Sequence, residues 1–368
     1  MNKKIIFFVP NIDDGGIEKN LVILSNYFLK KNHDVEIIFS RISRKILKKL
    51  NSKIILKKTN NYLNLKFLNE RVNNSINCFI FCLLKLKVKK QSVLFSMQDH
   101  PFGILLSMIK NIPSIIRIAN HPIGSLKYFN NYFIYKIKLF IKLFFYHFAN
   151  IIICNSKESA LYVRNSLIYK KKIFSIYNPI SRKKYKEKFK RIKYELVTIG
   201  RLEKQKNLEG LIDAIRLTSK KIPMIKLTIV GKGSQKKKLQ KLVKKFQLTK
   251  HVKFKNFSNP YLYYKNQGVF ILNSFFEGLP NVLLEAMQYK IPIIASKCQS
   301  GPTEILLNGK YGSLVKVNDP KDLSNKIEKV ILNYPDAIKK AKIALESLNR
   351  FDEEKQCYKY LKIIKSLN

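Results

Sequence analysis

Two hydrophobic patterns alternate along the N-terminal half of the chain. Short apolar runs predict strands buried on both faces, and between them apolar residues recur at helical spacing, as in Ile17–Lys31. Alternation of strand and helix predicts a parallel sheet with helices on both faces. The predicted strands are Lys4–Val9, Val35–Ser40, Lys53–Leu56, Val93–Met97, Ser114–Ala119, Asn150–Cys154 and Lys172–Tyr177.

The same alternation begins again near Tyr194, which predicts a second doubly wound α/β domain. Two similar halves of this kind are expected to enclose a ligand-binding cleft. The predicted strands are Glu195–Ile199, Lys226–Val230, Val252–Phe254, Val269–Leu272 and Pro292–Ser296, and the predicted helices are Asn207–Ser219, Gln235–Phe246 and Asn281–Gln288.

The boundary between the halves is expected in residues 179–193, because 182-RKKYKEKFKRIK-193 is as polar and charged as a surface linker. We therefore predict an N-terminal domain at 1–178, this basic linker, and a C-terminal domain at 194–350. A final helix is expected within 351–368, where apolar residues again recur at helical spacing.

Length and composition fit this division. The 368 residues match two domains of ordinary size, and a hydrophobic content of 46% is enough for two cores. No run reaches the roughly 20 apolar residues of a membrane span, and Ile5–Val9 is too short for a secretory signal. The five cysteines form no Cys-x-x-Cys pair, which excludes a disulfide scaffold and a cysteine-rich zinc module and predicts reduced thiols in the cytoplasm.

The chain is strongly basic, with 71 Lys and Arg against 24 Asp and Glu and a net charge of +47. One explanation is the codon composition of an A/T-rich genome, which enriches Lys, Asn, Ile, Phe and Tyr. The other is attraction to a polyanion, either an anionic membrane surface or nucleic acid. The charge is spread along the chain and forms no compact basic arm, so nucleic acid is the less favoured partner.

The segment Asn131–Phe148 interleaves lysines with phenylalanines and isoleucines at helical spacing. It is either a core-facing helix with solvated lysines or a helix that lies on an anionic membrane. Phenylalanines on more than one face favour the membrane contact. The residues predicted to make it are Lys136, Phe140, Lys142 and Phe144.

The strongest candidate for a ligand site is 277-EGLPNVLLE-285, which joins a predicted strand to a predicted helix. Backbone N–H groups at a helix start, aided by the helix dipole, bind anions such as a diphosphate. Glu277 precedes that start, and Glu285 lies about 6 Å further along the helix than the turn. Two carboxylates flanking an anion site suit a sugar–diphosphate–ribose ligand, although each could be an ordinary helix charge. The residues of the turn are Gly278, Leu279, Pro280 and Asn281.

A second candidate segment, 198-TIGRLEKQKN-207, follows another predicted strand. Ligands of doubly wound sheets bind beyond the carboxyl ends of the strands, so Arg201 and Lys206 are expected near the same diphosphate. Arginine would clamp it with two hydrogen bonds, and lysine would supply a point charge. In so basic a chain, the position after a strand favours Arg201 more than Lys206.

The N-terminal domain offers weaker signals. Gly15 and Gly16 in 10-PNIDDGGIEKN-20 let the backbone approach a ligand, but the Gly-x-Gly-x-x-Gly spacing of a dinucleotide site is missing. His100 and His121 each follow a predicted strand, and either is a candidate donor to a sugar hydroxyl or a simple turn residue. The chain has no Asp-x-Asp motif and no metal-ligand spacing, so we expect no metal and no cofactor.

These segments together resemble the retaining glycosyltransferases of family 4 (glycosyl transferase group 1), whose GT-B fold has two Rossmann-like domains facing across a cleft. The segment 13-DDGGIEKNLVILSNYFLKKNHDVEIIF-39 looks like the family's glycine loop, helix and second strand, so the resemblance covers nearly the whole chain. The C-terminal segments that resemble family motifs, in the expected order, are 199-IGRLEKQKN-207, 228-TIVGKGS-234, 277-EGLPNVLLE-285 and 301-GPTEILLNGKYGSLV-315.

The resemblance implies that residues 1–178 bind the acceptor and residues 194–350 bind the nucleotide sugar. It also implies roles for the donor-binding residues. Gly16 would contact the donor diphosphate, Arg201 and Lys206 would neutralise it as it leaves, and Glu285 would bind the ribose hydroxyls. It also implies that the segment after Phe351 crosses back to the N-terminal domain, and that the reaction proceeds without a metal ion.

The resemblance further places Glu277 by the donor sugar. It places His121, with His100 as the alternative, near the reacting sugar.

The predicted function is transfer of a sugar from a nucleotide sugar, with UDP expected, to a lipid-linked or cell-surface glycan acceptor. The enzyme would work in the cytoplasm at the inner face of the cell membrane. The segment 300-SGPTEIL-306 resembles members that transfer N-acetylhexosamines. A nucleotide-sugar 2-epimerase of the same fold and a basic nucleic-acid-binding protein are the alternatives.

Overall fold

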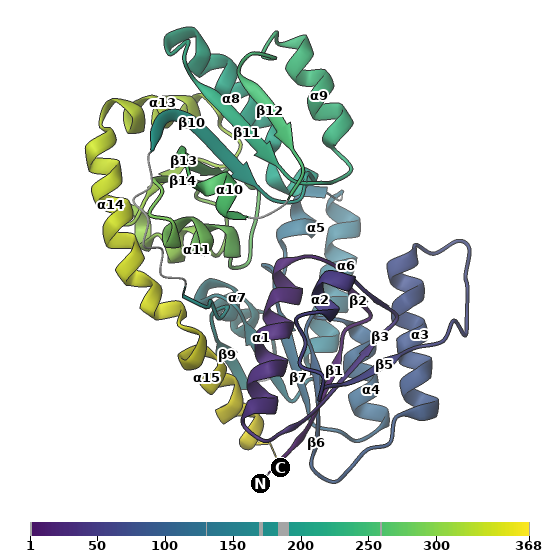
Figure 1. Cartoon of the computed structure of the whole chain (residues 1–368). Helices are drawn as coiled ribbons and strands as arrows, with labels where there is room; N and C mark the ends of the chain where they lie inside the picture. The colour runs from purple at the N-terminus through teal and green to yellow at the C-terminus, as the bar shows by residue number, and fades with distance from the viewer. Residues whose placement is uncertain (1, 130, 169–171, 183–190, 258–259, 368) are drawn as a thin grey trace. The chain divides into compact units, whose positions relative to one another are not determined.

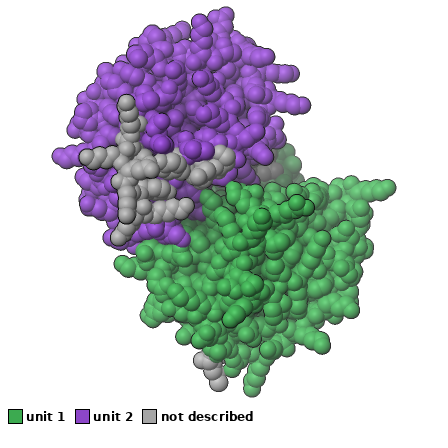
Figure 2. Space-filling model, viewed as in Figure 1, with its two compact units in different colours: residues 1–179, 351–368 green, residues 180–350 purple. Residues whose placement is uncertain are grey.

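The computed structural model in Figure 1 describes residues 2–129, 131–168, 172–182, 191–257 and 260–367. The chain divides into two compact units, residues 1–179 with 351–368 and residues 180–350, which Figure 2 colours separately. Each unit holds its own parallel sheet, so the predicted α/β fold is confirmed. Most of the predicted basic linker, residues 183–190, lies outside the described residues.

The first unit is built on a seven-stranded parallel sheet with the order β5-β3-β1-β6-β7-β8-β9. Every strand lies close to its predicted position, and β5 begins two residues after the predicted start. The strands are β1 (Lys4–Phe8), β3 (Asp34–Phe39), β5 (Ile55–Lys58), β6 (Ser92–Ser96), β7 (Ser114–Ile118), β8 (Ile151–Cys154) and β9 (Lys172–Ser175), and a separate two-stranded sheet pairs β2 (Asn11–Ile12) with β4 (Arg41–Ile42).

Helices cover both faces of this sheet, because successive side chains of a strand point to opposite sides. Ile5 and Phe7 of β1 pack in one core with α1 and α15, which run alongside each other in Figure 1. Ile6 and Phe8 pack on the other face with α3 and α4. The helices are α1 (Gly16–Lys30), α2 (Arg44–Leu47), α3 (Glu70–Lys85), α4 (Pro101–Ile109), α5 (Gly124–Phe129), α6 (Tyr132–Tyr146), α7 (Lys157–Ser166) and α15 (Glu353–Lys365).

A buried arginine ties the C-terminal helix to the first sheet. Arg117 in β7 is 1% exposed, and its Nε donates a hydrogen bond to the Tyr360 hydroxyl of α15 over 3.2 Å. Its Nη2 donates to Oδ1 of Asn178 over 2.5 Å. Both partners are neutral acceptors, so the guanidinium is held by hydrogen bonds that keep α15 against β7.

The second unit is a six-stranded parallel sheet with the order β12-β11-β10-β13-β14-β15. Its main core lies between the sheet and helices α8, α9 and α13. The strands are β10 (Ile192–Ile199), β11 (Lys226–Val230), β12 (Val252–Lys255), β13 (Gln267–Leu272), β14 (Ile293–Ser296) and β15 (Ser313–Val315). The helices are α8 (Leu208–Lys221), α9 (Lys236–Lys245), α10 (Pro260–Tyr264), α11 (Asn281–Gln288), α12 (Pro302–Ile305), α13 (Pro320–Leu332) and α14 (Tyr334–Ser347).

Candidate active site

The second sheet reverses its winding direction between β10 and β13. The chain lays down β10, β11 and β12 outward in one direction and then places β13 on the other side of β10. In doubly wound sheets, ligands bind at such a reversal, beyond the carboxyl ends of the strands. Arg201 and Lys206 follow β10, and Glu277 follows β13. Three of the predicted site residues therefore lie where the topology favours a ligand.

Hydrogen bonds hold the loops after β10 and β13 against each other. The backbone N–H of Phe275 donates to the carbonyl of Gln205 over 2.9 Å, and the Gln205 side-chain amide donates to the carbonyl of Phe276 over 2.9 Å. The side-chain amide of Asn273 donates to the carbonyl of Asn207 over 3.0 Å. These bonds fix the 3-10 turn Lys204–Lys206 relative to the loop that carries Glu277.

Lys206 and Glu277 form an ion pair, with 2.5 Å between Nζ and Oε1. The same carboxylate oxygen accepts a hydrogen bond from the Ser274 hydroxyl over 2.6 Å, and Glu277 is only 5% exposed. A buried carboxylate is costly unless it is paired and hydrogen-bonded, so Lys206 and Ser274 offset the burial of Glu277. The sequence placed these two charges in separate motifs, and the structure brings them into one site.

Arg201 is exposed and lies two residues after the end of β10. Its loop is hydrogen-bonded to the turn 230-VGKGS-234. The N–H of Leu202 donates to the carbonyl of Lys232, and the N–H of Gln235 donates to the carbonyl of Leu202, each over 2.9 Å. A Cβ on Gly233 would collide with the Leu202 backbone, so this turn requires glycine. Within the described ranges the Arg201 side chain has no ion pair or hydrogen bond, which leaves its guanidinium for a ligand.

Helix α11 begins at Asn281, after Pro280, whose side chain makes no capping hydrogen bond. The preceding turn is held by the Ser300 hydroxyl, which donates to the carbonyl of Gly278 over 3.0 Å. Leu279 is buried in that turn, and Glu285 is partly exposed one helical turn further on. A helix start that follows a loop with neighbouring cations is a favourable place for a diphosphate.

In the first unit, the sheet reverses its winding direction between β1 and β6. Gly15, the residue before α1, has an extended backbone with φ −119°. The carboxylate of Glu18 folds back over it, so that a Cβ on Gly15 would lie 2.5 Å from Glu18 Oε2. Gly15 therefore leaves room for the Glu18 carboxylate at the start of α1, a contact that the sequence pattern did not reveal.

The two candidate histidines differ in their surroundings. His121 follows β7 and is 3% exposed, with its ring centroid 5.0 Å from that of Tyr162, and its Nδ1 has no partner in the described part of the chain. His100 is the residue before α4, and its Nε2 lies 3.0 Å from the hydroxyl of Ser75 in α3. Burial, aided by the positive charge of Lys142, lowers the pKa of His121 to about 4. Burial lowers the pKa of His100 as well, and its Nδ1 also has no partner in the described part of the chain, so both histidines stay candidates.

A buried network near His121 was missed by sequence reasoning. Asp99 Oδ2 lies 2.5 Å from Nζ of Lys142 and accepts a hydrogen bond from the Tyr146 hydroxyl over 2.6 Å. Burial alone would raise the pKa of Asp99, but the charge of Lys142 and these bonds lower it overall. Lys142 also donates to the carbonyl of Pro122, the residue after His121, over 3.4 Å. Lys142 therefore belongs to this network, and its membrane contact stays a prediction.

Helix α6 presents an apolar stripe to solvent. Phe140 is 71% exposed and Phe144 is 51% exposed, and Phe133 and Ile137 continue the same stripe at spacings of three and four residues. Lys136 lies beside it, with its ammonium 5.3 Å from the ring centroid of Tyr132. No helix within the described ranges is long and apolar enough to cross a membrane.

Comparison with known proteins shows what the second unit resembles. Residues 180–355 match the family described as Glycosyl transferases group 1. The chain is 34% identical over 244 residues to an uncharacterized glycosyltransferase of Methanocaldococcus jannaschii, covering 58% of this chain and 59% of that protein. It is 25% identical over 334 residues, 89% of each chain, to a protein of Campylobacter jejuni named as an alpha-1,4-N-acetyl-D-galactosaminyltransferase that acts on a diphospho-undecaprenol-linked glycan. The chain spans 59%, 50% and 40% of the first three curated relatives.

Solved structures resemble the whole chain. A variant of S. aureus TarM in complex with fondaparinux, alpha-GlcNAc-glycerol and UDP superimposes with a TM-score of 0.82 at 17% identity, covering 99% of this chain and all of that one. Anabaena HepE in complex with UDP and glucose gives a TM-score of 0.78 at 19% identity and covers both chains fully. Residues 180–355 thus match the group 1 glycosyltransferases, in a chain that has the GT-B fold.

Proposed function

We propose that the protein transfers an N-acetylhexosamine from a UDP-linked donor to a lipid-linked or glycan acceptor. The observation that carries this proposal is the arrangement at the winding reversal of the second unit, where Arg201 and the Lys206–Glu277 pair follow β10 and β13 and the same loop leads into α11. The relatives support it, since two from Campylobacter jejuni are named as N-acetylgalactosaminyltransferases with diphospho-undecaprenol-linked substrates. The TarM and HepE structures are both complexes with UDP.

The proposed reaction breaks the bond between the anomeric carbon of the donor sugar and the diphosphate, and forms a bond from that carbon to an acceptor oxygen. Negative charge develops on the leaving diphosphate, where fixed cations and helix N–H groups stabilise the transition state most. Arg201, Lys206 and the first N–H groups of α11 are the groups assigned to this task.

We propose that the configuration is retained without a protein nucleophile. Oε1 of Glu277 is already engaged by Lys206 and Ser274, which makes this carboxylate a poor nucleophile. The acceptor hydroxyl would attack from the face that the diphosphate leaves, and its proton would pass to a diphosphate oxygen. No group of three His, Cys, Asp or Glu side chains within the described ranges could hold a metal ion, and metal independence stays a prediction.

Of the two alternatives, neither gains support. Every one of the similar curated proteins cited above is named a transferase, which favours transfer to an acceptor over 2-epimerisation of the free donor. A nucleic-acid-binding protein has only the net charge of +47 in its favour. Product analysis of a UDP-sugar incubated without acceptor separates the first alternative, because only an epimerase converts the free donor.

The donor site is tested by calorimetric titration of UDP and UDP-N-acetylglucosamine into the full chain and its Glu285→Ala variant. We expect the wild type to bind both and the variant to bind about 10- to 100-fold more weakly, because one or two hydrogen bonds from ribose hydroxyls to a charged carboxylate are lost. Glu346→Ala, which removes an exposed carboxylate of α14, is the matched control and should bind as the wild type does. A wild type that binds none of UDP, GDP and ADP would overturn the donor assignment.

We also propose that α6 holds the enzyme on an anionic membrane surface, at the inner face of the cell membrane where a lipid-linked acceptor would be found. The exposed stripe of Phe133, Ile137, Phe140 and Phe144 supplies apolar area, and Lys136 supplies positive charge beside it. This combination is typical of helices that lie in the membrane interface.

Replacing Phe140 by serine should weaken binding to vesicles of phosphatidylglycerol and phosphatidylcholine by roughly tenfold, because a buried phenylalanine contributes about 1.5–3 kcal/mol. Co-sedimentation of the full chain with vesicles measures the change. Phe67→Ser removes an 82% exposed phenylalanine outside α6 and serves as the control. Equal losses in the two variants would count against a specific role for α6.

A further inference from the structure

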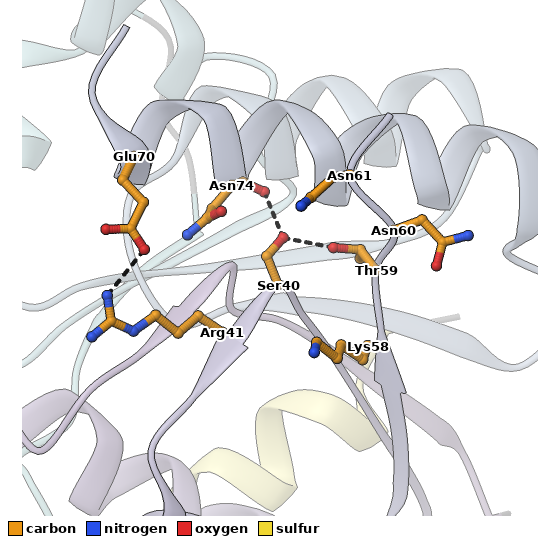
Figure 3. Close-up of a pocket in the computed structure, with 8 residues that line it drawn as sticks. All are labelled: Ser40, Arg41, Lys58, Thr59, Asn60, Asn61, Glu70 and Asn74. Atoms are coloured by element: carbon orange, nitrogen blue, oxygen red, sulfur yellow. Dashed lines mark hydrogen bonds and ion pairs between the residues drawn. The ribbon is translucent and has the colours of Figure 1, made fainter. Parts of the chain in front are cut away.

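The first unit contains a polar hollow of about 410 Å³ that none of the predicted site residues lines. Figure 3 shows it between the start of α3 and the ends of β3 and β5. All its lining side chains are charged or polar, so a ligand there would be held by hydrogen bonds and charge. The lining residues include Ser40, Arg41, Lys58, Asn61, Glu70 and Asn74.

The floor of this hollow is rigid. β3 and β5 pair in parallel with Phe39 opposite Lys58, and the N–H of Thr59 donates to the carbonyl of Phe39 over 2.9 Å. The Ser40 hydroxyl lies 2.6 Å from the Thr59 hydroxyl and donates to the carbonyl of Asn74 in α3 over 3.0 Å. The strands and α3 are thus fastened together at the base, which keeps the hollow in shape without a ligand.

The rim offers groups that a ligand can reach. The Arg41–Glu70 ion pair, 3.0 Å long, forms one side, and both side chains are more than half exposed. Figure 3 shows the Asn61 side chain extending toward Ser40 from the opposite side. Lys58 and Asn61 have no ion pair or side-chain hydrogen bond within the described part of the chain. The rim therefore combines donors from arginine, lysine and amides with acceptors from a carboxylate and amides.

We infer that this hollow binds a sugar unit of the glycan acceptor, which rests on the function proposed above. Each sugar hydroxyl both donates and accepts a hydrogen bond, as side-chain amides and a carboxylate–guanidinium pair do together. A phosphate only accepts, and Lys58 would attract it while Glu70 would repel it. Because Arg41 is already paired with Glu70, the remaining groups are mainly amides, which suit a neutral sugar and its N-acetyl group.

The position of the hollow indicates which sugar unit along the acceptor it would bind. The carboxyl ends of parallel strands share one edge of the sheet, and three strand spacings separate β3 from β7, after which His121 lies. At about 4.8 Å for each spacing, the hollow is roughly 14 Å from that position. Its occupant is therefore a sugar of the acceptor away from the reacting hydroxyl, whose binding energy would help to orient the reacting end.

Contacts also link the hollow to the glycine loop. Arg71 of α3 pairs with Asp13 over 3.1 Å, and the Ser43 hydroxyl donates to Asp14 over 2.6 Å. The Asn74 side-chain amide donates to Oδ1 of Asn11 over 2.6 Å. A sugar seated between Arg41 and Asn61 would brace the same segments that hold residues 13–16, so acceptor binding would order the loop before Gly16.

The test uses saturation-transfer-difference NMR of N-acetylglucosamine, N-acetylgalactosamine and glucose with the full chain and saturating UDP. We expect at least one sugar to bind the wild type, and Asn61→Ala and Lys58→Ala each to weaken it about fivefold, the effect of one lost hydrogen bond. Asn64→Ala, an exposed asparagine of the same loop outside the hollow, is the matched control and should leave binding unchanged.

No sugar signal with the wild type, or equal signals from the wild type and both hollow variants, would overturn the inference. So would pyrophosphate binding that Lys58→Ala removes while no sugar binds, since the hollow would then be an anion site. Calorimetry with UDP on the same samples keeps the two proposals apart. Intact UDP binding without a sugar effect overturns the acceptor subsite alone, whereas no UDP binding overturns the proposed function.

Discussion

Replacing Lys206 by methionine should lower kcat/KM for sugar transfer by roughly 10²- to 10³-fold, the range seen when one preorganised group that stabilises developing charge is removed. Two effects act in the same direction. The ammonium that would face the leaving diphosphate is lost, and the Glu277 carboxylate, 5% exposed, is left without its cation. The rate of UDP release in the presence of acceptor is the measurement.

The same substitution should also destabilise the chain by about 3–5 kcal/mol, because it leaves one partner of a buried ion pair uncompensated. The double variant Lys206→Met with Glu277→Gln separates the two effects, since it removes both charges and keeps the hydrogen-bonding shape of the side chain. We expect it to recover most of the stability and little of the activity. Recovery of full activity by the double variant would show that Lys206 acts only as a structural partner of Glu277.

The sequence predicted Lys206 and Glu277 as site residues, but it did not predict the ion pair between them. Each residue was found from its place after a predicted strand, because strand periodicity and loop position are local properties. The contact between them joins residues 71 positions apart and depends on β13 lying beside β10. That neighbourhood follows from the winding reversal, which the order of strands along the chain does not specify.

Helix α6 shows that sequence periodicity predicts a helix but not which of its side chains point inward. The periodicity of Asn131–Phe148 correctly predicted a helix, which spans Tyr132–Tyr146. It could not tell which lysine turns inward, because that choice depends on Asp99, which follows another strand 43 residues earlier. Lys142 is the lysine that forms an ion pair with Asp99. The start of β5 was missed for a related reason, since pairing with β3 sets the strand ends.

Lowering the pH from about 6.5 to 4 should cost the native state about 3 kcal/mol through His121 alone. Burial and the charge of Lys142 lower the pKa of this histidine to about 4 in the folded chain, against 6.5 for the unfolded chain. Between these values the unfolded chain binds a proton that the native chain does not. The free energy of unfolding therefore rises with pH across this window and is insensitive to His121 above it.

Urea denaturation of the wild type and a His121→Gln variant at several pH values measures this contribution, followed by circular dichroism because the chain has no tryptophan. The variant should show a smaller loss of stability between pH 6.5 and 4. Burial also lowers the pKa values of His33 and His100, so a residual slope of the same sign is expected in the variant. Equal slopes in the two proteins would mean that His121 is as easily protonated in the folded chain as in the unfolded one. A neutral histidine beside Lys142 could then no longer be assumed for the sugar-binding role proposed for it.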